Sequence, residues 1–123
     1  HIGVVRLFLE KGADVNEAIE LEGPWSPVYV CYDAGEPEIA RLLLDKGADI
    51  DYAARNGCTL LFVACQRGHV RVAYYLLENG ADVDRPNENG VTPLHIVSEN
   101  GDVGAVRLLI NYDATINQAD DDG

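Results

Sequence analysis

Asn89-Gly90-Val91-Thr92-Pro93-Leu94-His95 is the stretch of this 123-residue chain that decides its fold. Asn-Gly is a strong turn signal because both residues tolerate positive φ. Thr92 stands where a helix N-cap is wanted, and Pro93 occupies the first helical position, where its missing amide proton costs nothing. The stretch therefore predicts a tight turn that leads directly into a helix.

The same phrases return along the chain at a fixed interval. Degraded copies of the helix-opening phrase stand at Ser26-Pro27-Val28-Tyr29 and Thr59-Leu60-Leu61-Phe62. Three pairs of glycines are 33 residues apart, namely Gly47 and Gly80, Gly57 and Gly90, and Gly68 and Gly101. A period of this length indicates stacked supersecondary units rather than one globular core.

Residues 52–84 show the unit most clearly, with a turn followed by two predicted helices. The first runs from about Leu60 to Arg67, and Gly68 ends it in the left-handed region. The second runs from about Val70 to Asn79, and its apolar residues, at helical spacing, are Val72, Ala73, Leu76 and Leu77. A single unit would leave this face exposed, so its stability must come from stacking on its neighbours.

These residues resemble the ankyrin repeat, with a turn, a short helix, a longer helix and the exit phrase Gly80-Ala81-Asp82-Val83-Asp84. The resemblance covers the whole chain. It implies an all-α solenoid of stacked helix–turn–helix units with β-hairpin fingers. It also implies protein–protein recognition on a concave surface lined by the fingers and the inner helices.

The repeats divide a chain that is a single domain by length. We expect a partial repeat at 1–16, repeats at 17–51, 52–84 and 85–117, and the start of a further repeat at 118–123. His1 aligns with His69, so the first helix of its repeat is missing. This pattern favours a fragment of a longer array. The alternative is a short protein that hides its ends by stacking on itself.

The composition of the chain excludes several classes of function. The formal net charge is −12 with only nine basic residues, which argues against nucleic-acid binding. No apolar run approaches the roughly 18 residues that span a bilayer. Three cysteines without a CxxC pair are typical of small buried hydrophobes in a reducing compartment, and we expect an intracellular protein, cytoplasmic or nuclear.

The charge is uneven along the chain. Residues 17–51 hold nine acidic and two basic side chains, whereas 52–84 hold three of each. The asymmetry favours a partner with a basic patch, and the alternative is a solubilising surface.

Catalytic and cofactor chemistry find no support in the pattern. Cys65 and His69 form a Cys-x-x-x-His pair on two different predicted helices, which is a weak basis for a metal site. The glycines end helices instead of opening them after a strand as in phosphate loops. The acidic tail at 120–122 lacks the spacing of a calcium loop. We expect no catalytic residue, no metal and no cofactor, and therefore no enzyme.

Residues that the repeat does not need for its own fold are available to a partner, and the resemblance puts them at the finger tips and outer turns. They are Trp25, Asp33, Arg55, Asn56, Cys58, Gln66, Arg67, Glu88, Asn89, Val91, Glu99 and Asn100. Trp25 is the first candidate for contact with a partner, because Trp and Arg side chains dominate the energetics of protein interfaces. The alternative is that Trp25 packs within its own finger, which is enlarged because the repeat at 17–51 is two residues longer than the others. Arg55 and Arg67 suggest a basic spot within an acidic groove, and the alternative is a solvated surface.

Departures from the repeat pattern lead to two local expectations. Phe62 replaces the histidine that His95 retains, so it forfeits a hydrogen bond within the turn, worth about 1 kcal/mol. Asp113 stands where a glycine is expected and must enter the left-handed region.

We expect a protein-binding module that acts by rigid surface complementarity. The alternatives are a structural spacer, a self-assembling array, or a regulatory segment of a larger enzyme.

Overall fold

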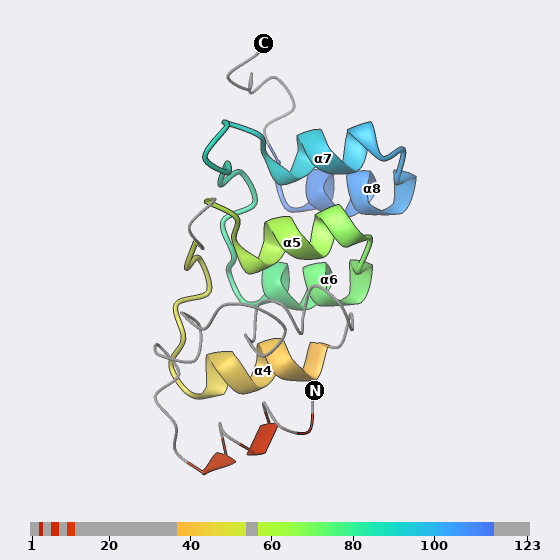
Figure 1. Ribbon diagram of the computed structural model, residues 1–123. Coiled ribbons are helices and arrows are strands. Elements are labelled where there is room, and N and C mark those ends of the chain that lie inside the picture. The colour runs from red at the N-terminus through yellow and green to blue at the C-terminus, as the bar shows by residue number, and fades with distance from the viewer. Residues whose placement is uncertain (1–2, 4–5, 8–9, 12–36, 54–56, 115–123) are drawn as a thin grey trace.

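The computed structural model describes residues 3, 6–7, 10–11, 37–53 and 57–114. Its named helices are α4 (Pro37–Asp45), α5 (Leu60–Arg67), α6 (Val70–Glu78), α7 (Pro93–Glu99) and α8 (Val103–Asn111). The expected all-α fold is confirmed (Figure 1). The two helices predicted within 52–84 are α5 and α6, and α6 ends one residue earlier than expected. No helix in the described part is long and apolar enough to cross a membrane.

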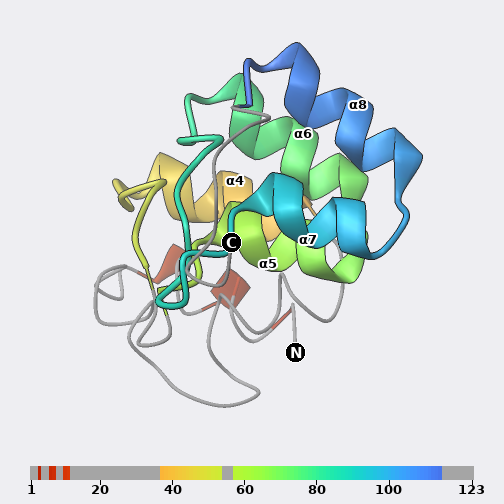
Figure 2. The same ribbon diagram turned by 90° about the horizontal axis from the view of Figure 1, so that it is seen from above.

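The helices form two layers, visible from above in Figure 2. Helices α4, α6 and α8 lie side by side in an outer layer, and α5 and α7 form the inner one. Helix α5 packs on α6 and α7 packs on α8, which makes each helix pair one unit. The fingers leave one edge of this stack, and the turns between paired helices lie along the opposite edge.

The hydrophobic core runs through the stack without a break. Leu43, Leu76 and Leu109 occupy the same repeat position in α4, α6 and α8, and each is 0% exposed. They belong to one buried cluster that extends from α4 to α8 and includes residues of both layers. Each helix pair therefore covers the apolar face of the next, as the stacking argument requires.

The helix ends follow the local sequence. Thr59 Oγ1 accepts a hydrogen bond from Phe62 N–H at 3.1 Å and begins α5, and Gly68 ends it with φ of 74°. Thr92 Oγ1 accepts from His95 N–H at 3.2 Å and begins α7. Asp113 has φ of 67°, so its predicted left-handed conformation is confirmed.

The finger before α5 is held by less sheet pairing than a full hairpin. Ala53 and Thr59 form one isolated antiparallel bridge, and no longer strand occurs among the described residues. Side-chain bonds to the backbone supply the remaining order of the fingers.

The imidazole of His95 confirms the expected hydrogen bond within its turn. Its Nδ1 accepts from Thr92 N–H at 3.2 Å, which completes a reciprocal capping box with the Thr92 hydroxyl. At the matching position of α5, Phe62 has no acceptor to return the bond. Helices α5 and α7 occupy equivalent places in their repeats, but the start of α5 has one of these capping hydrogen bonds and the start of α7 has two.

We expect His95→Ala to lower the free energy of unfolding by about 1 kcal/mol, because the buried end of α7 loses one backbone bond. His95→Gln should recover part of the loss, since glutamine completes the same capping box. Urea denaturation followed by circular dichroism measures both. Equal stability of His95→Ala and the wild type would show that the return bond contributes nothing.

Candidate functional site

The finger edge is built from aspartate side chains that bind backbone amides. Asp49 Oδ1 accepts from Asp51 N–H at 2.9 Å, and Asp82 Oδ1 accepts from Asp84 N–H at 3.0 Å. Asp51 Oδ1 in turn accepts from Asp82 N–H at 2.8 Å, which ties one finger to the next. The exit phrase of each repeat therefore both turns the chain and joins neighbouring repeats.

The finger before α7 is fixed from inside by Asn87. Its Oδ1 accepts from Asn89 N–H at 2.9 Å and Val91 N–H at 3.0 Å. Its own N–H donates to the Val91 carbonyl at 2.9 Å. Sequence reasoning missed Asn87, although an asparagine two residues before Asn-Gly is a recognisable signal for such a side-chain turn.

Neighbouring fingers touch through their backbones at Gly57. A Cβ on this residue would stand 2.5 Å from Glu88 N and 2.9 Å from the Asn87 carbonyl carbon, and φ is 78°. Only glycine fits here without displacing one finger. The contact leaves the side chains of Glu88 and Asn89 exposed on a fixed backbone.

The opposite edge joins the turns that follow α5 and α7. Asn100 Nδ2 donates to the Gln66 carbonyl at 3.3 Å, across 34 residues of sequence. Asp102 caps α8 by accepting from Ala105 N–H at 3.1 Å. Its carboxylate lies beside the other turn, since Oδ2 is 3.8 Å from the Cβ position of Gly68. The structure thereby brings together four predicted residues that are all exposed: Gln66, Arg67, Glu99 and Asn100.

Cys58 is placed differently from its sequence assignment to the binding surface. It is 7% exposed and clusters with Phe62 and Val63. Burial raises the pKa of its thiol, the charge of Glu88 raises it further, and a hydrogen bond with Asn87 opposes the shift. An apolar side chain at the start of α5 gains more from this cluster than from water, so Cys58 does not enter our proposed surface.

Cys65 follows the expectation for small buried hydrophobes. Burial is the main cause that raises the pKa of its thiol to about 12, and the charge of Asp102 adds to it. Both described cysteines are buried. At neutral pH they are thiols rather than reactive thiolates.

The remaining predicted residues separate into two groups. Glu88 and Asn89 lie at the finger edge, and the four residues around the joined turns lie at the other edge. The eight-residue helix α5 separates these edges by about 12 Å. Val91 is half-buried and packs against the Cys58 cluster. Four predicted residues lie outside the described ranges: Trp25, Asp33, Arg55 and Asn56.

The arrangement offers charged and amide side chains on a fixed frame. Across the described ranges, no group of three or more His, Cys, Asp or Glu side chains is placed to hold a metal ion. The exposed carboxylate, guanidinium and amide groups suit contacts with another polar surface.

Paired helices that stack in two layers, with fingers along one edge, define a helical repeat protein whose units depend on each other. The chain belongs to the ankyrin-repeat family: the model of ankyrin repeats (3 copies) matches residues 1–87 and 28–120. Ankyrin repeats are generally protein–protein interaction modules and are typically non-catalytic.

Relatives share parts of this array. The chain is 40% identical over 60 residues to the mouse 2-5A-dependent ribonuclease, covering 49% of this chain and 8% of that protein. It is 36% identical over 59 residues to mouse ankyrin repeat and SAM domain-containing protein 6, covering 48% of this chain and 7% of that protein. Mouse protein phosphatase 1 regulatory subunit 27 is 38% identical over 53 residues, with 43% and 33% covered. The matches thus span well under two thirds of each relative.

Proposed function

We propose that this chain binds a partner protein on the surface formed by its finger tips and the joined turns of its inner helices. The observation that carries the proposal is that both edges present exposed side chains on backbone held by contacts between repeats. Gly57 lies against the finger of the next repeat, and the Asn100 side chain donates a hydrogen bond to the turn that follows α5. Binding to such a frame orders few groups, so less of the interaction energy is lost.

The charges of this surface favour a partner with a basic patch. The chain carries a net charge of −12, and Glu88 and Glu99 are exposed on the two edges. Arg67 is exposed at the joined turns and would meet an acidic group of the partner. Trp25 and Arg55 extend the proposed surface from sequence alone. Because exposed charge pairs are screened, the association should weaken as salt rises.

The test compares three baits in a pull-down from lysate of the source cells, read by quantitative mass spectrometry. The first is the wild type, and the second combines Arg67→Glu with Glu88→Arg, which leaves the net charge unchanged. The third is Lys11→Glu, a change at an exposed residue near the start of the chain. Thermal melts establish that all three are folded to the same extent.

We expect partners that bind the wild type and Lys11→Glu and are lost by the double variant. That pattern, followed by the same loss with the purified partner, would locate binding on the proposed edges. Partners that bind all three baits equally would contradict the surface. A chain that binds no partner but sediments as concentration-dependent oligomers would favour the self-assembling array.

A further inference from the structure

The outer face of the stack carries a row of side chains that the repeat register aligns. Arg41, Tyr74 and Arg107 occupy the same position in α4, α6 and α8, and these helices lie side by side. Tyr74 is 52% exposed although it is a large aromatic residue, and both arginines are exposed. This row belongs to the outer layer, opposite the layer formed by α5 and α7.

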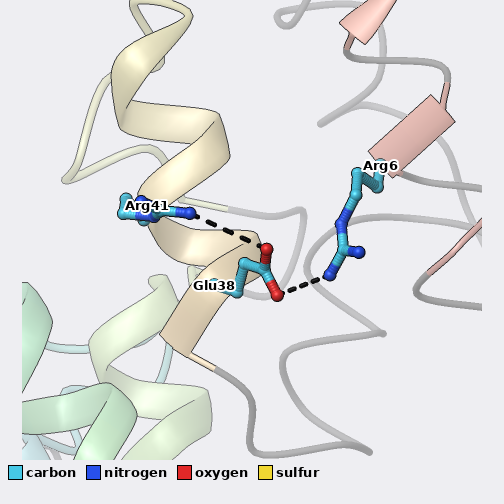
Figure 3. Close-up of polar contacts among 3 residues, drawn as sticks. All are labelled: Arg6, Glu38 and Arg41. Carbon is cyan, nitrogen blue, oxygen red and sulfur yellow. Dashed lines mark hydrogen bonds and ion pairs between the residues drawn. The ribbon is translucent and has the colours of Figure 1, made fainter.

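Arg6 extends the row beyond α4. Its Nη2 lies 2.5 Å from Glu38 Oε2, and Arg41 Nη2 lies 3.7 Å from Glu38 Oε1 (Figure 3). Two guanidinium groups thus share one carboxylate, which leaves a positive charge uncompensated by that carboxylate. Arg6 Nε is buried and has no hydrogen-bond partner within the described residues. The Arg6 side chain as a whole is 38% exposed, and a further anionic group can reach this exposed part but not the buried Nε.

The basic residues of this acidic chain gather on the same layer. The described outer-layer segments, with residues 6, 10–11, 37–46, 70–78 and 103–111, contain six basic and four acidic side chains. The complete chain has nine basic and 21 acidic residues. These outer-layer segments therefore carry a formal net charge of +2, in contrast to −12 for the complete chain.

Exposed apolar side chains lie beside the row. Val70 and Val103 stand one helical turn before Tyr74 and Arg107, and Val103 is 63% exposed. Residues four apart share one face of a helix, so these valines form a parallel apolar strip. The face thus combines guanidinium groups, an aromatic ring and aliphatic groups.

We propose that the outer row, defined as Arg6, Arg41, Tyr74 and Arg107, binds an extended acidic segment of a partner protein that crosses the outer helices. Packed helices are about 10 Å apart, so Arg41 and Arg107 are separated by about 20 Å. An extended chain covers about 3.3 Å per residue, which sets its two acidic residues about six positions apart. An apolar residue two or four positions after the first acidic residue lies on the same side of the extended chain and contacts Tyr74 and the valine strip.

Three fluorescein-labelled synthetic peptides test this geometry by fluorescence anisotropy at low salt. The first has two glutamates six positions apart with a leucine two positions after the first glutamate, in a Gly/Ser background, so that all three side chains lie on one side of the extended chain. The second has the same composition with adjacent glutamates, and the third replaces both glutamates by glutamine. The proteins are the wild type, Arg41→Gln with Arg107→Gln, and the matched control Lys46→Gln with Arg85→Gln, two exposed residues outside the outer row. Both variants lose two positive charges.

We expect the first peptide to bind the wild type, with affinity at least about fivefold above that of either other peptide. The outer-row variant should lose this preference, and the control should retain it. Equal weakening in both variants would show that binding follows net charge, and it would overturn the proposal. Absence of binding by the first peptide would overturn it as well. Vesicles rich in anionic phospholipid form the last arm, and binding to these alone would assign the row to a membrane surface.

Discussion

Leu76→Ala is expected to lower the free energy of unfolding by about 4 kcal/mol, because it leaves a cavity in the middle of the stack. Leu76 is 0% exposed and sits in α6, which packs against α4 on one side and α8 on the other. The equivalent residues Leu43 and Leu109 are equally buried, so the neighbouring helices have no spare side chain to fill the space. Because the core is continuous, the loss of packing at Leu76 affects the contacts of α6 with both α4 and α8.

The measurement is urea denaturation of Leu76→Ala beside Ile110→Ala. Ile110 is an aliphatic residue of α8 that is 42% exposed, so its truncation should cost under about 1.5 kcal/mol. Similar losses in the two variants would contradict the central place of Leu76 in the core. A lower denaturant slope in Leu76→Ala alone would show that the repeats on either side of α6 no longer unfold together.

Gly57→Ala should cost about 3 kcal/mol, from strain at positive φ together with overlap between two fingers. The added methyl would stand 2.5 Å from Glu88 N, and this neighbour is backbone that the Asn87 side chain holds in place. Relief requires one finger to move. The substitution should also weaken partner binding, since Glu88 and Asn89 would shift without being replaced.

Gly80→Ala is the matched control. Gly80 has φ of 90°, and no atom lies within 4 Å of its Cβ position, so its cost should be strain alone, about 1 kcal/mol. Thermal and urea denaturation of both variants give the difference. If the two alanines cost the same, the close approach of the fingers at Gly57 does not exist in solution. If Gly57→Ala is destabilised but binds its partner normally, the finger edge is not part of the binding surface.

The sequence alone predicted the repeating unit because its signals are local. Helix α5 begins at Thr59 and ends at Gly68 through bonds within a few residues, so its limits follow from the residues themselves. The hydrogen bond of His95 to its own turn and the positive φ of Asp113 have the same origin. The 33-residue period then predicted stacked units, because one unit cannot cover its own apolar face, and the resemblance of the repeated phrases indicated the family.

The candidate surface was predicted less completely. The pattern identified six residues that the structure leaves exposed at the finger tips and turns, but it treated them as one set. It also assigned Cys58 to the surface, and it overlooked Asn87. Burial of Cys58 depends on its contact with Phe62 and Val63 and on the apolar residues of the next repeat. Side-chain spacing within one repeat carries no information about that contact.

The sequence by itself determined the helices, their caps and the stacked architecture, since these rest on short-range hydrogen bonds and a regular apolar period. Only the tertiary structure decided which groups of different repeats meet. It separates the binding candidates into two edges, closes the fingers at Gly57 and sets Arg6 and Arg41 on one carboxylate. The Gly57 and Arg6 contacts join residues about one repeat apart, and the two edges lie at opposite ends of α5, so the arrangement appears when neighbouring units pack together.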